Sequence, residues 1–492
     1  MSTSGGFGRH FLSGAFWTLV QLFGRQAIQS LAFFAFAWFM TPESFGIAAM
    51  ATSLGFLGRL VVERGVADQV IQRPGLSARS LSTTFWLAML FGLAMALLLA
   101  GTGWIVSASN PALGPVLPFA VAALVPLCVA PGQVHEGLIR RQAGFRQLAG
   151  LQMAVSAASV AVSLGLLMLG AGIWAVIGFV LAEAIFKTAG LWSLNAWRPD
   201  WQFDRQDAWA QCRFSGAVVL GAVLTVGNLR IVEIVLGSML GPAAAGYFRL
   251  GVQVNRLLTQ VLRTPVSKMM LPGFARLTDP GRIAARLLDV MVLASLVTLP
   301  FFVLAAAGAP DLFELVMGAE WRPAGEAALW ICLGIYAQIL PPLVNPVLIA
   351  QGRPMEGTRL AAVIFASGLC LAVAGALLQG LTGAAAGLAA TAVFALPYTI
   401  ALTVRNFELA AAEILRAVAA PFAASAAAFA AAAAMLHGQA APAPGRLAAA
   451  LLLGGGVYLL LAAAGVWILD RPRAKRLAPL LKKRSGPPAA DL

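Results

Sequence analysis

Long apolar segments separated by short polar breaks run through nearly the whole chain. Most of them have about 20 residues or slightly more, the length of a helix that crosses a bilayer. The strict apolar–polar alternation of membrane β-strands is absent from these segments, which are rich in Ala, Leu and Gly. The pattern predicts an all-α polytopic membrane protein of about fourteen transmembrane helices. The expected spans lie near 11–40, 44–62, 83–107, 114–137, 147–169, 172–195, 215–239, 243–266, 288–308, 324–350, 360–379, 382–403, 417–436 and 447–469.

Composition excludes the soluble alternative for these 492 residues. Hydrophobic residues make up 60% of the chain and charged residues 11%, whereas a soluble domain carries about 25% charged residues. The loops between the expected spans are too short to form a domain. The four cysteines and three histidines are scattered and include no CxxC pair, so we expect no metal site and no cofactor.

The basic residues predict how the chain is oriented in the membrane. The formal net charge is +14, from 34 basic and 20 acidic residues. With both termini in the cytoplasm, 25 basic residues lie on the inner side, and the outer loops hold two, Arg322 and Arg446. This asymmetry follows the positive-inside rule, so the net charge does not require a nucleic-acid partner. Membrane lipids are the expected contacts of the basic tail, residues 471–492.

An internal repeat relates the two halves of the chain. Ser13-Gly14-Ala15 matches Ser215-Gly216-Ala217, and Pro42 and Gly46 match Pro242 and Gly246 at an offset of 200 residues. A weaker match after the fourth and tenth spans preserves the order. The repeat predicts two six-helix lobes, 1–203 and 204–406, related by a pseudo-two-fold axis along the membrane normal. Two further helices occupy 407–470.

Seven basic residues lie inside expected spans, where an unpaired charge is costly. Arg59, Lys187 and Arg263 are near cytoplasmic ends, where long side chains can reach the interface. Arg249, Arg256 and Arg263 recur every seven residues and so should share one helix face. The remaining two basic residues, Arg25 and Arg230, lie deeper in their spans. Gln253 and Gln260, each four residues after an arginine, are expected on the same face as Arg249 and Arg256.

Acidic residues at similar depth are too few to neutralise this set. Glu183 and Glu233 are the two deep carboxylates, and Arg230 is expected to pair with Glu233, three residues away. The interior is therefore expected to be cationic and to bind an anionic group such as phosphate. The candidate substrate-binding residues are Arg25, Arg249, Arg256, Arg263, Arg59, Arg230, Gln253 and Gln260. Glu183 and Glu233 are also the candidates for binding a coupling ion.

Several segments resemble one family of transporters. "MTPESFGIAAMATSLGFLGRLVVERGVADQVIQR", "LSTTFWLAMLFGL", "LIRRQAGFRQLA", "WRPDWQF", "LGPAAAGYFRL" and "LPGFARL" are similar to segments of the Wzx-type oligosaccharide flippases. These flippases form the polysaccharide-transporter branch of the multidrug/oligosaccharidyl-lipid/polysaccharide exporter superfamily. The colanic acid exporter subgroup is the most similar. The resemblance covers residues 10–360, and the last four spans match in hydropathy alone.

The resemblance implies a flippase without enzymatic activity in a bacterial inner membrane. It implies two lobes around a cavity that opens alternately to either side, and an undecaprenyl-pyrophosphate-linked oligosaccharide as substrate. A polymerase of the same pathway is a further candidate partner. A lipid II flippase or a drug exporter on the same scaffold is one alternative. The other is a membrane enzyme of polysaccharide assembly, although the outer loop 309–323, with Asp311, Glu314 and Glu320, shows no positioned acid–base pair.

Overall fold

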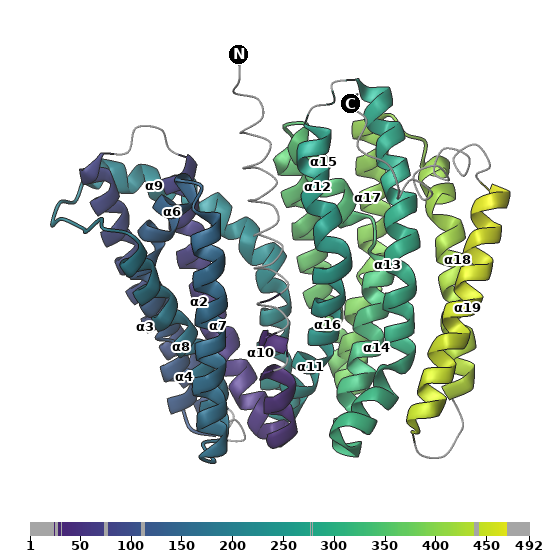
Figure 1. The fold of residues 1–492 in the computed structure, drawn as a ribbon, viewed down its shortest axis with the longest axis horizontal. Helices are drawn as coiled ribbons and strands as arrows, with labels where there is room; N and C mark the ends of the chain where they lie inside the picture. Colours follow the sequence, from purple (N-terminus) through teal and green to yellow (C-terminus); the bar gives the residue numbers. More distant parts are fainter. Residues whose placement is uncertain are drawn as a thin grey trace. The chain divides into compact units, whose positions relative to one another are not determined.

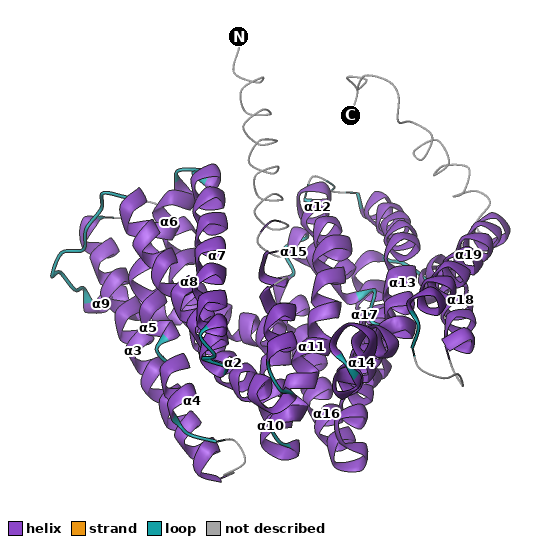
Figure 2. Cartoon of the chain, turned by 60° about the horizontal axis from the view of Figure 1, so that its bottom comes forward, coloured by secondary structure: helices purple, strands orange, loops and turns teal. Residues whose placement is uncertain are grey.

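Helices are the only regular elements in the described part of the chain, as the ribbon and the cartoon show (Figure 1, Figure 2). The computed structural model describes Gly24 and residues 28–30, 32–72, 77–109, 114–275, 277, 279–436 and 442–469. The predicted all-α class is confirmed. Ten helices or helix runs in this part are long and apolar enough to cross a membrane, and two shorter apolar helices are Ile28–Phe39 and Pro341–Ala350. The count of fourteen crossings stays a prediction.

The chain divides into two compact units. Unit 1 comprises Met1–Gln253 and Phe365–Leu388, and unit 2 comprises Val254–Ile364 and Ala389–Leu492. Unit 1 therefore contains the predicted first lobe together with residues 204–253 and 365–388 of the predicted second lobe. The lobe boundaries at 203 and 406, and the pseudo-two-fold axis, stay predictions.

Unit 1 is built around the long helix α2. This helix packs against α3, α6, α8, α9 and α10, and α7 packs against α8. Its described helices are Ile28–Phe39, α2 (Pro42–Gln72), α3 (Ala78–Ser109), α4 (Leu117–Ala122), α5 (Val125–Val129), η2 (Ala130–Gly132), α6 (Gln133–Arg141), α7 (Phe145–Met168), α8 (Ile173–Leu194), α9 (Arg205–Ala222), the π turn η3 (Val223–Gly227), α10 (Asn228–Leu240), most of α11 (Pro242–Leu258) and residues Phe365–Leu388 of α16.

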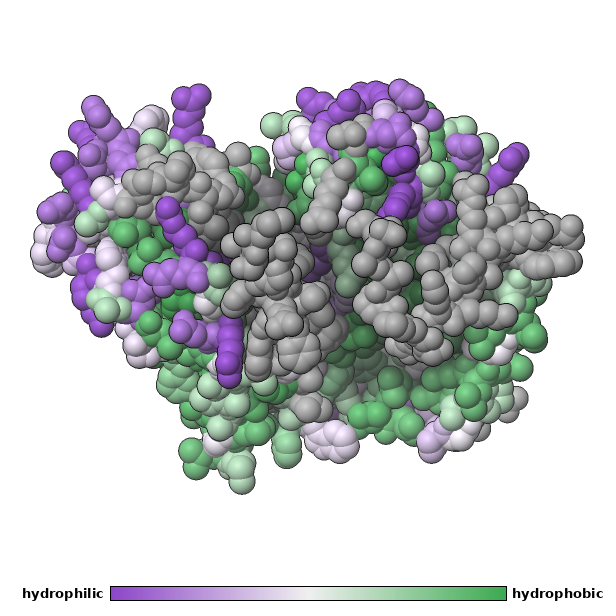
Figure 3. All heavy atoms as spheres, turned by 45° about the horizontal axis from the view of Figure 1, so that its top comes forward, coloured by the Kyte–Doolittle hydropathy of each residue, from purple (hydrophilic) through white to green (hydrophobic). Residues whose placement is uncertain are grey.

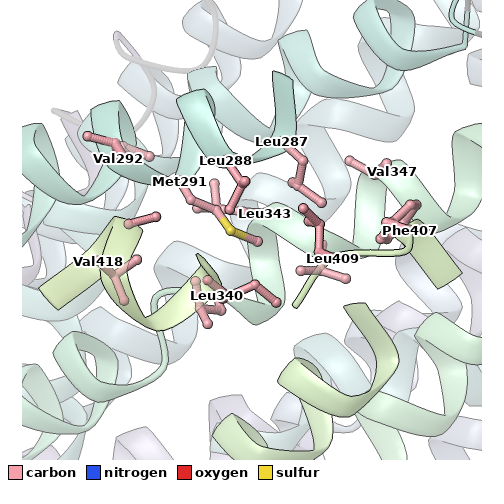
Figure 4. Close-up of a cluster of buried hydrophobic side chains, with 14 of the residues drawn as sticks. Leu287, Leu288, Met291, Val292, Leu340, Leu343, Val347, Phe407, Leu409 and Val418 are labelled. Atoms are coloured by element: carbon pink, nitrogen blue, oxygen red, sulfur yellow. The ribbon is translucent and has the colours of Figure 1, made fainter. Parts of the chain in front are cut away.

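Unit 2 is built around α13, which packs against α14, α18 and α19. Its helices are the end of α11, the π turn η4 (Thr259–Arg263), α12 (Thr264–Phe274), α13 (Pro280–Met317), η5 (Ala319–Trp321), α14 (Arg322–Ala337), α15 (Pro341–Ala350), parts of α16 (Pro354–Ala390), α17 (Ala392–Phe407), α18 (Ala411–Leu436) and α19 (Pro444–Leu469). Its core joins α13 and α15 with the α17–α18 segment through Leu287, Met291, Leu343, Phe407 and Leu409 (Figure 4).

Several helices extend beyond the apolar segments that predicted them. Residues 309–323, expected to be an outer loop, belong mainly to α13, which continues to Met317. Likewise α2 continues to Gln72, and α12 to Phe274. Polar residues can continue a helix outside the apolar layer, because helical backbone hydrogen bonds do not require an apolar side chain. Hydropathy therefore underestimated the lengths of these helices.

The turn between the eleventh and twelfth expected spans is present at the predicted place. Gln379 and Gly380 have non-helical backbone angles, and Gly380 has a φ of 61°, which glycine adopts without strain. Gly375 and Gly383 lie on opposite sides of this turn. A Cβ on Gly375 would lie 2.0 Å from the Gly383 carbonyl oxygen, so the two helical arms pack backbone to backbone.

Prolines inside the membrane helices leave carbonyls that neighbouring helices satisfy. Pro300 on α13 removes the donor for Leu296 four residues earlier, and the Tyr458 hydroxyl of α19 donates to that carbonyl at 2.6 Å. On α15, Pro346 removes the donor for Pro342, and the Ser267 hydroxyl of α12 donates to that carbonyl at 3.2 Å. These bonds meet the requirement that backbone groups in lipid find partners within the protein.

In each unit, hydrophilic side chains gather towards one end of the helices, and apolar side chains cover the visible surface nearer the other end (Figure 3). The hydrophilic end of unit 1 includes α6 and the beginning of α9. That of unit 2 includes α12 and α15. This distribution is typical of helices that cross an apolar layer and end in a polar one.

Candidate functional site

Arg249, Arg256 and Arg263 form the arginine stripe expected on one helix face, and the first two of them lie on α11. Arg249 and Gln253 are buried, with 7% and 5% of their surface exposed, and Arg256 is half-buried. Gln253 donates to the Ser30 hydroxyl at 3.0 Å, while Arg249 lies 5.9 Å from the Phe33 ring. Both side chains therefore meet the helix Ile28–Phe39, which confirms that they share one face.

The helix geometry interrupts the stripe before Arg263. Residues Thr259–Arg263 form the π turn η4, which includes Gln260. A π turn accommodates an extra residue, so a spacing of seven residues across it no longer places two side chains on one face. The expectation that Arg256 and Arg263 share a face is therefore wrong. Arg263 and Gln260 are half-buried, and their role in substrate binding stays a prediction.

Arg249 belongs to a buried ion cluster with Glu233 and Arg230 of α10. The Arg249 Nε donates to both carboxylate oxygens of Glu233, at 2.9 and 2.8 Å, and its Nη2 lies 2.6 Å from Oε1. The Arg230 Nη1 donates to the other carboxylate oxygen at 3.2 Å, which confirms the pairing expected from the sequence. Glu233 has 2% of its surface exposed. The two guanidinium groups share one carboxylate.

Helix α2 supplies the other partners of this cluster. The Arg249 Nη2 donates to the Ala49 carbonyl at 2.6 Å and to the Ser53 hydroxyl at 2.7 Å, and Thr52 Oγ1 lies 3.5 Å away. Arg230 lies over the Phe56 ring at 5.1 Å. The expectation that the stripe lacks acidic partners is therefore wrong for Arg249. The cluster can neutralise buried charge and hold α10 and α11 against α2.

A second buried network contains Arg59 and Lys187. Lys187 on α8 lies 2.8 Å from Glu136 Oε2 and 2.9 Å from Glu63 Oε1, and the Arg59 Nε donates to Glu63 Oε1 at 2.9 Å. Glu183 lies 3.7 Å from Arg59, and Arg140 pairs with Glu136. Three acids thus face three bases. The network joins α2, α6 and α8, so Arg59 and Lys187 have ion-pair partners within the fold.

Sequence reasoning missed Glu63 and Glu136 because it placed both at the edges of spans. The spacing of these two glutamates from Arg59 and Arg140 could have identified them. Glu63 is four residues after Arg59, and Glu136 is four residues before Arg140, the distance at which charged side chains meet on a helix.

Arg25 lies outside the described residues. In the described part of the chain, no group of three or more His, Cys, Asp or Glu side chains is arranged to hold a metal ion.

Acidic side chains near the end of α13 form ion pairs instead of an acid–base site. Arg322 pairs with Glu314 and lies 3.9 Å from both Asp311 and Glu326. Arg446 lies 3.7 Å from Asp311. The hydrogen bond to Glu314 raises the pKa of Arg322 above its ordinary value. These pairs join α13 to the segments that begin α14 and α19.

Three tryptophans, Trp38, Trp104 and Trp192, lie near the ends of expected spans, and the first two are exposed. Trp38 and Trp104 have 64% and 61% of their surface exposed. Trp192 instead stacks on the buried His135, with ring centroids 4.8 Å apart, and donates from Nε1 to the Pro131 carbonyl at 3.0 Å. It therefore also contributes to packing within unit 1.

Comparisons with known proteins place these features in a family context. A family profile described as "Polysaccharide biosynthesis protein" matches residues 35–326. The chain is 23% identical over 329 residues to the succinoglycan biosynthesis transport protein ExoT of Rhizobium meliloti (strain 1021). That alignment covers 65% of this chain and 64% of ExoT, so the chain matches less than two thirds of this relative's length.

A second relative and one solved structure extend the comparison. The lipopolysaccharide biosynthesis protein WzxC of Escherichia coli (strain K12) is 19% identical over 352 residues, which are 70% of each chain. The solved structure is the lipid II flippase MurJ in an inward closed conformation. It aligns with a TM-score of 0.69 at 13% identity, over 95% of this chain and 100% of that chain. At this identity the match shows a shared fold alone.

Proposed function

The chain belongs to the polysaccharide biosynthesis protein family, and from this membership we propose that it is a flippase for a lipid-linked oligosaccharide. The substrate is an oligosaccharide on undecaprenyl pyrophosphate, moved from the inner to the outer leaflet of a bacterial inner membrane. The product would supply exopolysaccharide or lipopolysaccharide synthesis. The observation that carries the proposal is the family match over 35–326, which contains both buried ion clusters and the arginines of α11.

The relatives support a transport role. ExoT is named as a transport protein of succinoglycan biosynthesis, and WzxC as a protein of lipopolysaccharide biosynthesis. MurJ, whose fold this chain shares, is named as a lipid II flippase.

The physical problem for such a protein is to carry a pyrophosphate and a glycan through an apolar layer. Guanidinium groups suit phosphate because they donate two parallel hydrogen bonds and stay charged. We assign pyrophosphate binding to Arg25 and Arg256, with Arg249, Arg263, Arg230 and the two glutamines as further contributors. The glycan would occupy an aqueous cavity between the lobes while the lipid tail stays in the bilayer, and alternating access would move the headgroup across.

The carboxylates proposed for ion coupling have partners inside the fold. Glu233 is held by two arginines, and Glu183 lies near Arg59. A coupling ion at either residue would have to compete with these basic side chains. We therefore base the transport proposal on the basic residues, and treat coupling as a separate question for these two carboxylates.

Two alternatives differ in what they predict. A lipid II flippase would be required for peptidoglycan synthesis and growth, whereas an oligosaccharide flippase would be required for polymer export. A membrane enzyme of polysaccharide assembly would change the glycan covalently. The ion-paired acids near the end of α13 offer no positioned acid–base pair for such chemistry.

The test is deletion of the gene in its native host, followed by extraction of lipid-linked sugars. We expect export of one surface polymer to stop and its oligosaccharide on undecaprenyl pyrophosphate to accumulate in the inner leaflet. A sealed-vesicle assay with an impermeant sugar-modifying enzyme measures that sidedness. Accumulation of incomplete sugars would indicate an enzyme, and arrest of peptidoglycan synthesis would indicate the lipid II alternative.

A further inference from the structure

The two copies of the internal repeat meet within unit 1 through reciprocal contacts. Gly46 on α2 and Gly246 on α11 are equivalent at the 200-residue offset. A Cβ on Gly46 would lie 1.7 Å from the Pro242 carbonyl oxygen, and a Cβ on Gly246 would lie 2.6 Å from the Pro42 carbonyl oxygen. Each glycine thus lies against the proline that begins the other helix. Reciprocal contacts of this kind are typical of a two-fold axis passing between the paired segments.

A second reciprocal pair joins α2 to α10 and α11 to the helix Ile28–Phe39. The Arg230 Nη1 donates to the Ser53 hydroxyl at 3.5 Å, and the Gln253 amide donates to the Ser30 hydroxyl at 3.0 Å. Ser53 and Gln253 are equivalent at the same offset, and so are Ser30 and Arg230. Ser53 and Gln253 each lie seven residues after the glycine of their helix, about two helical turns, so the reciprocal pattern extends beyond the glycines.

The charges at this contact do not follow the symmetry. The second copy contributes Arg230, Glu233 and Arg249. The equivalent positions of the first copy hold Ser30, Phe33 and Ala49. Arg249 donates to the carbonyl of Ala49, its own equivalent, across the contact. One copy therefore contributes the ion cluster, and the other contributes the hydroxyl and carbonyl groups that accept from it.

We propose that Glu233 and Arg249 are positioning residues for transport, which hold the α2–α11 contact closed and release it when the lobes change state. The proposal rests on the alternating access proposed above. The glycine surfaces allow the helices to approach and separate without interlocked side chains, so they supply little attraction of their own. Glu233 fixes the Arg249 fork, and the fork bonds to Ala49 and Ser53 of α2. Loss of this pair should therefore weaken the closed contact.

The test measures opening directly in the full chain. Cys128, Cys212, Cys332 and Cys370 are first replaced by alanine, and Thr52→Cys is introduced as the reporter. Thr52 has 4% of its surface exposed beside Arg249, so a thiol there should react slowly while the contact is closed. The purified protein is labelled in detergent with a small thiol reagent, without substrate.

Two unrelated changes should open the contact. Glu233→Gln removes the charge that holds Arg249, and Gly46→Ala inserts a Cβ where the Pro242 carbonyl lies. Each should raise the labelling rate about tenfold, which corresponds to about 1.4 kcal/mol. Arg249→Lys should give an intermediate rate, because lysine keeps the charge but loses the fork. The matched control is Gly150→Ala on α7, where a Cβ meets nothing within 4 Å and labelling should stay slow.

The outcomes separate this proposal from the proposed function. Unchanged labelling in both Glu233→Gln and Gly46→Ala would overturn the positioning role. So would a lower melting temperature with unchanged labelling, because the cluster would then stabilise the fold alone. If Glu233→Gln does not accumulate, Gly46→Ala and Arg249→Lys decide the question. The labelling needs no substrate, so a different cargo would leave the expected increase intact.

Discussion

Arg249 and Arg256 are seven residues apart on α11, yet their surroundings differ. Arg249 donates hydrogen bonds to Glu233 and to acceptor groups of α2, so its donors have partners within the protein. Arg256 is half-buried and lies three residues after Gln253, the last residue of the first segment of unit 1. The same residue type at the same helical spacing can therefore have a structural role at one position and a proposed substrate role at the next.

Replacement of Arg256 by Ala should reduce polymer export. Loss of one charge-assisted contact to pyrophosphate is worth about 1.5–3 kcal/mol, or about one to two decades of affinity. Arg256→Lys should rescue export partly, because it keeps the charge without the bidentate fork. Export and the amount of protein in the membrane are measured together. Normal export, or loss explained by degradation, would make Arg256 a structural residue.

In unit 2, side chains of neighbouring helices donate to the carbonyls that Pro300 and Pro346 leave without a backbone donor. The carbonyl of Leu296 would lack a donor in α13 if Tyr458 of α19 did not reach it. An unsatisfied carbonyl in lipid is costly, so the proline in α13 depends on the hydroxyl that α19 supplies. The last helix, which lies outside the two predicted lobes, is thus bonded to α13 of unit 2.

Tyr458→Phe should therefore destabilise unit 2 while preserving its packing. The ring stays and the hydroxyl is lost, so the expected cost is about 0.6–1.7 kcal/mol, the range measured for hydrogen bonds within membrane proteins. Thermal unfolding of the purified protein in detergent gives the change. Tyr398→Phe is the control, because it removes the same hydroxyl from a half-buried tyrosine of α17. Equal melting temperatures for both variants would show that the bond to Leu296 contributes nothing measurable.

At the scale of the molecule, the chain is a multi-pass membrane protein whose internal repeat is visible in its contacts. The reciprocal approaches of Gly46 and Gly246 occur at the offset found in the sequence. They support parallel copies that enter the membrane from the same side. The predicted even number of helices per copy would place both termini on one side, and the distribution of basic residues predicts that this side is the cytoplasm.

This topology predicts that the turn after α13 is outside the cell. A cysteine introduced in this turn can report its exposure to reagents outside the cell. Glu320 is a suitable position because it is exposed in η5, whereas the φ of 101° at Gly318 would strain any other side chain. In a background without native cysteines, Glu320→Cys should react with an impermeant reagent in intact cells. Ser77→Cys, in the expected inner loop before α3, should react after permeabilisation alone. The reverse pattern would contradict the orientation.

The sequence alone determined the membrane class, the turn at 379–380 and the pairing of Arg230 with Glu233, because these depend on hydropathy, local backbone chemistry and helical spacing. The tertiary structure decided which buried charges are neutralised. Glu233 reaches Arg249 from another helix, and Lys187 meets Glu63 and Glu136 from two others. Such pairs depend on which helices are neighbours and how they are aligned along their length. An apolar stretch is compatible with many neighbours and alignments, so hydropathy could not predict these contacts.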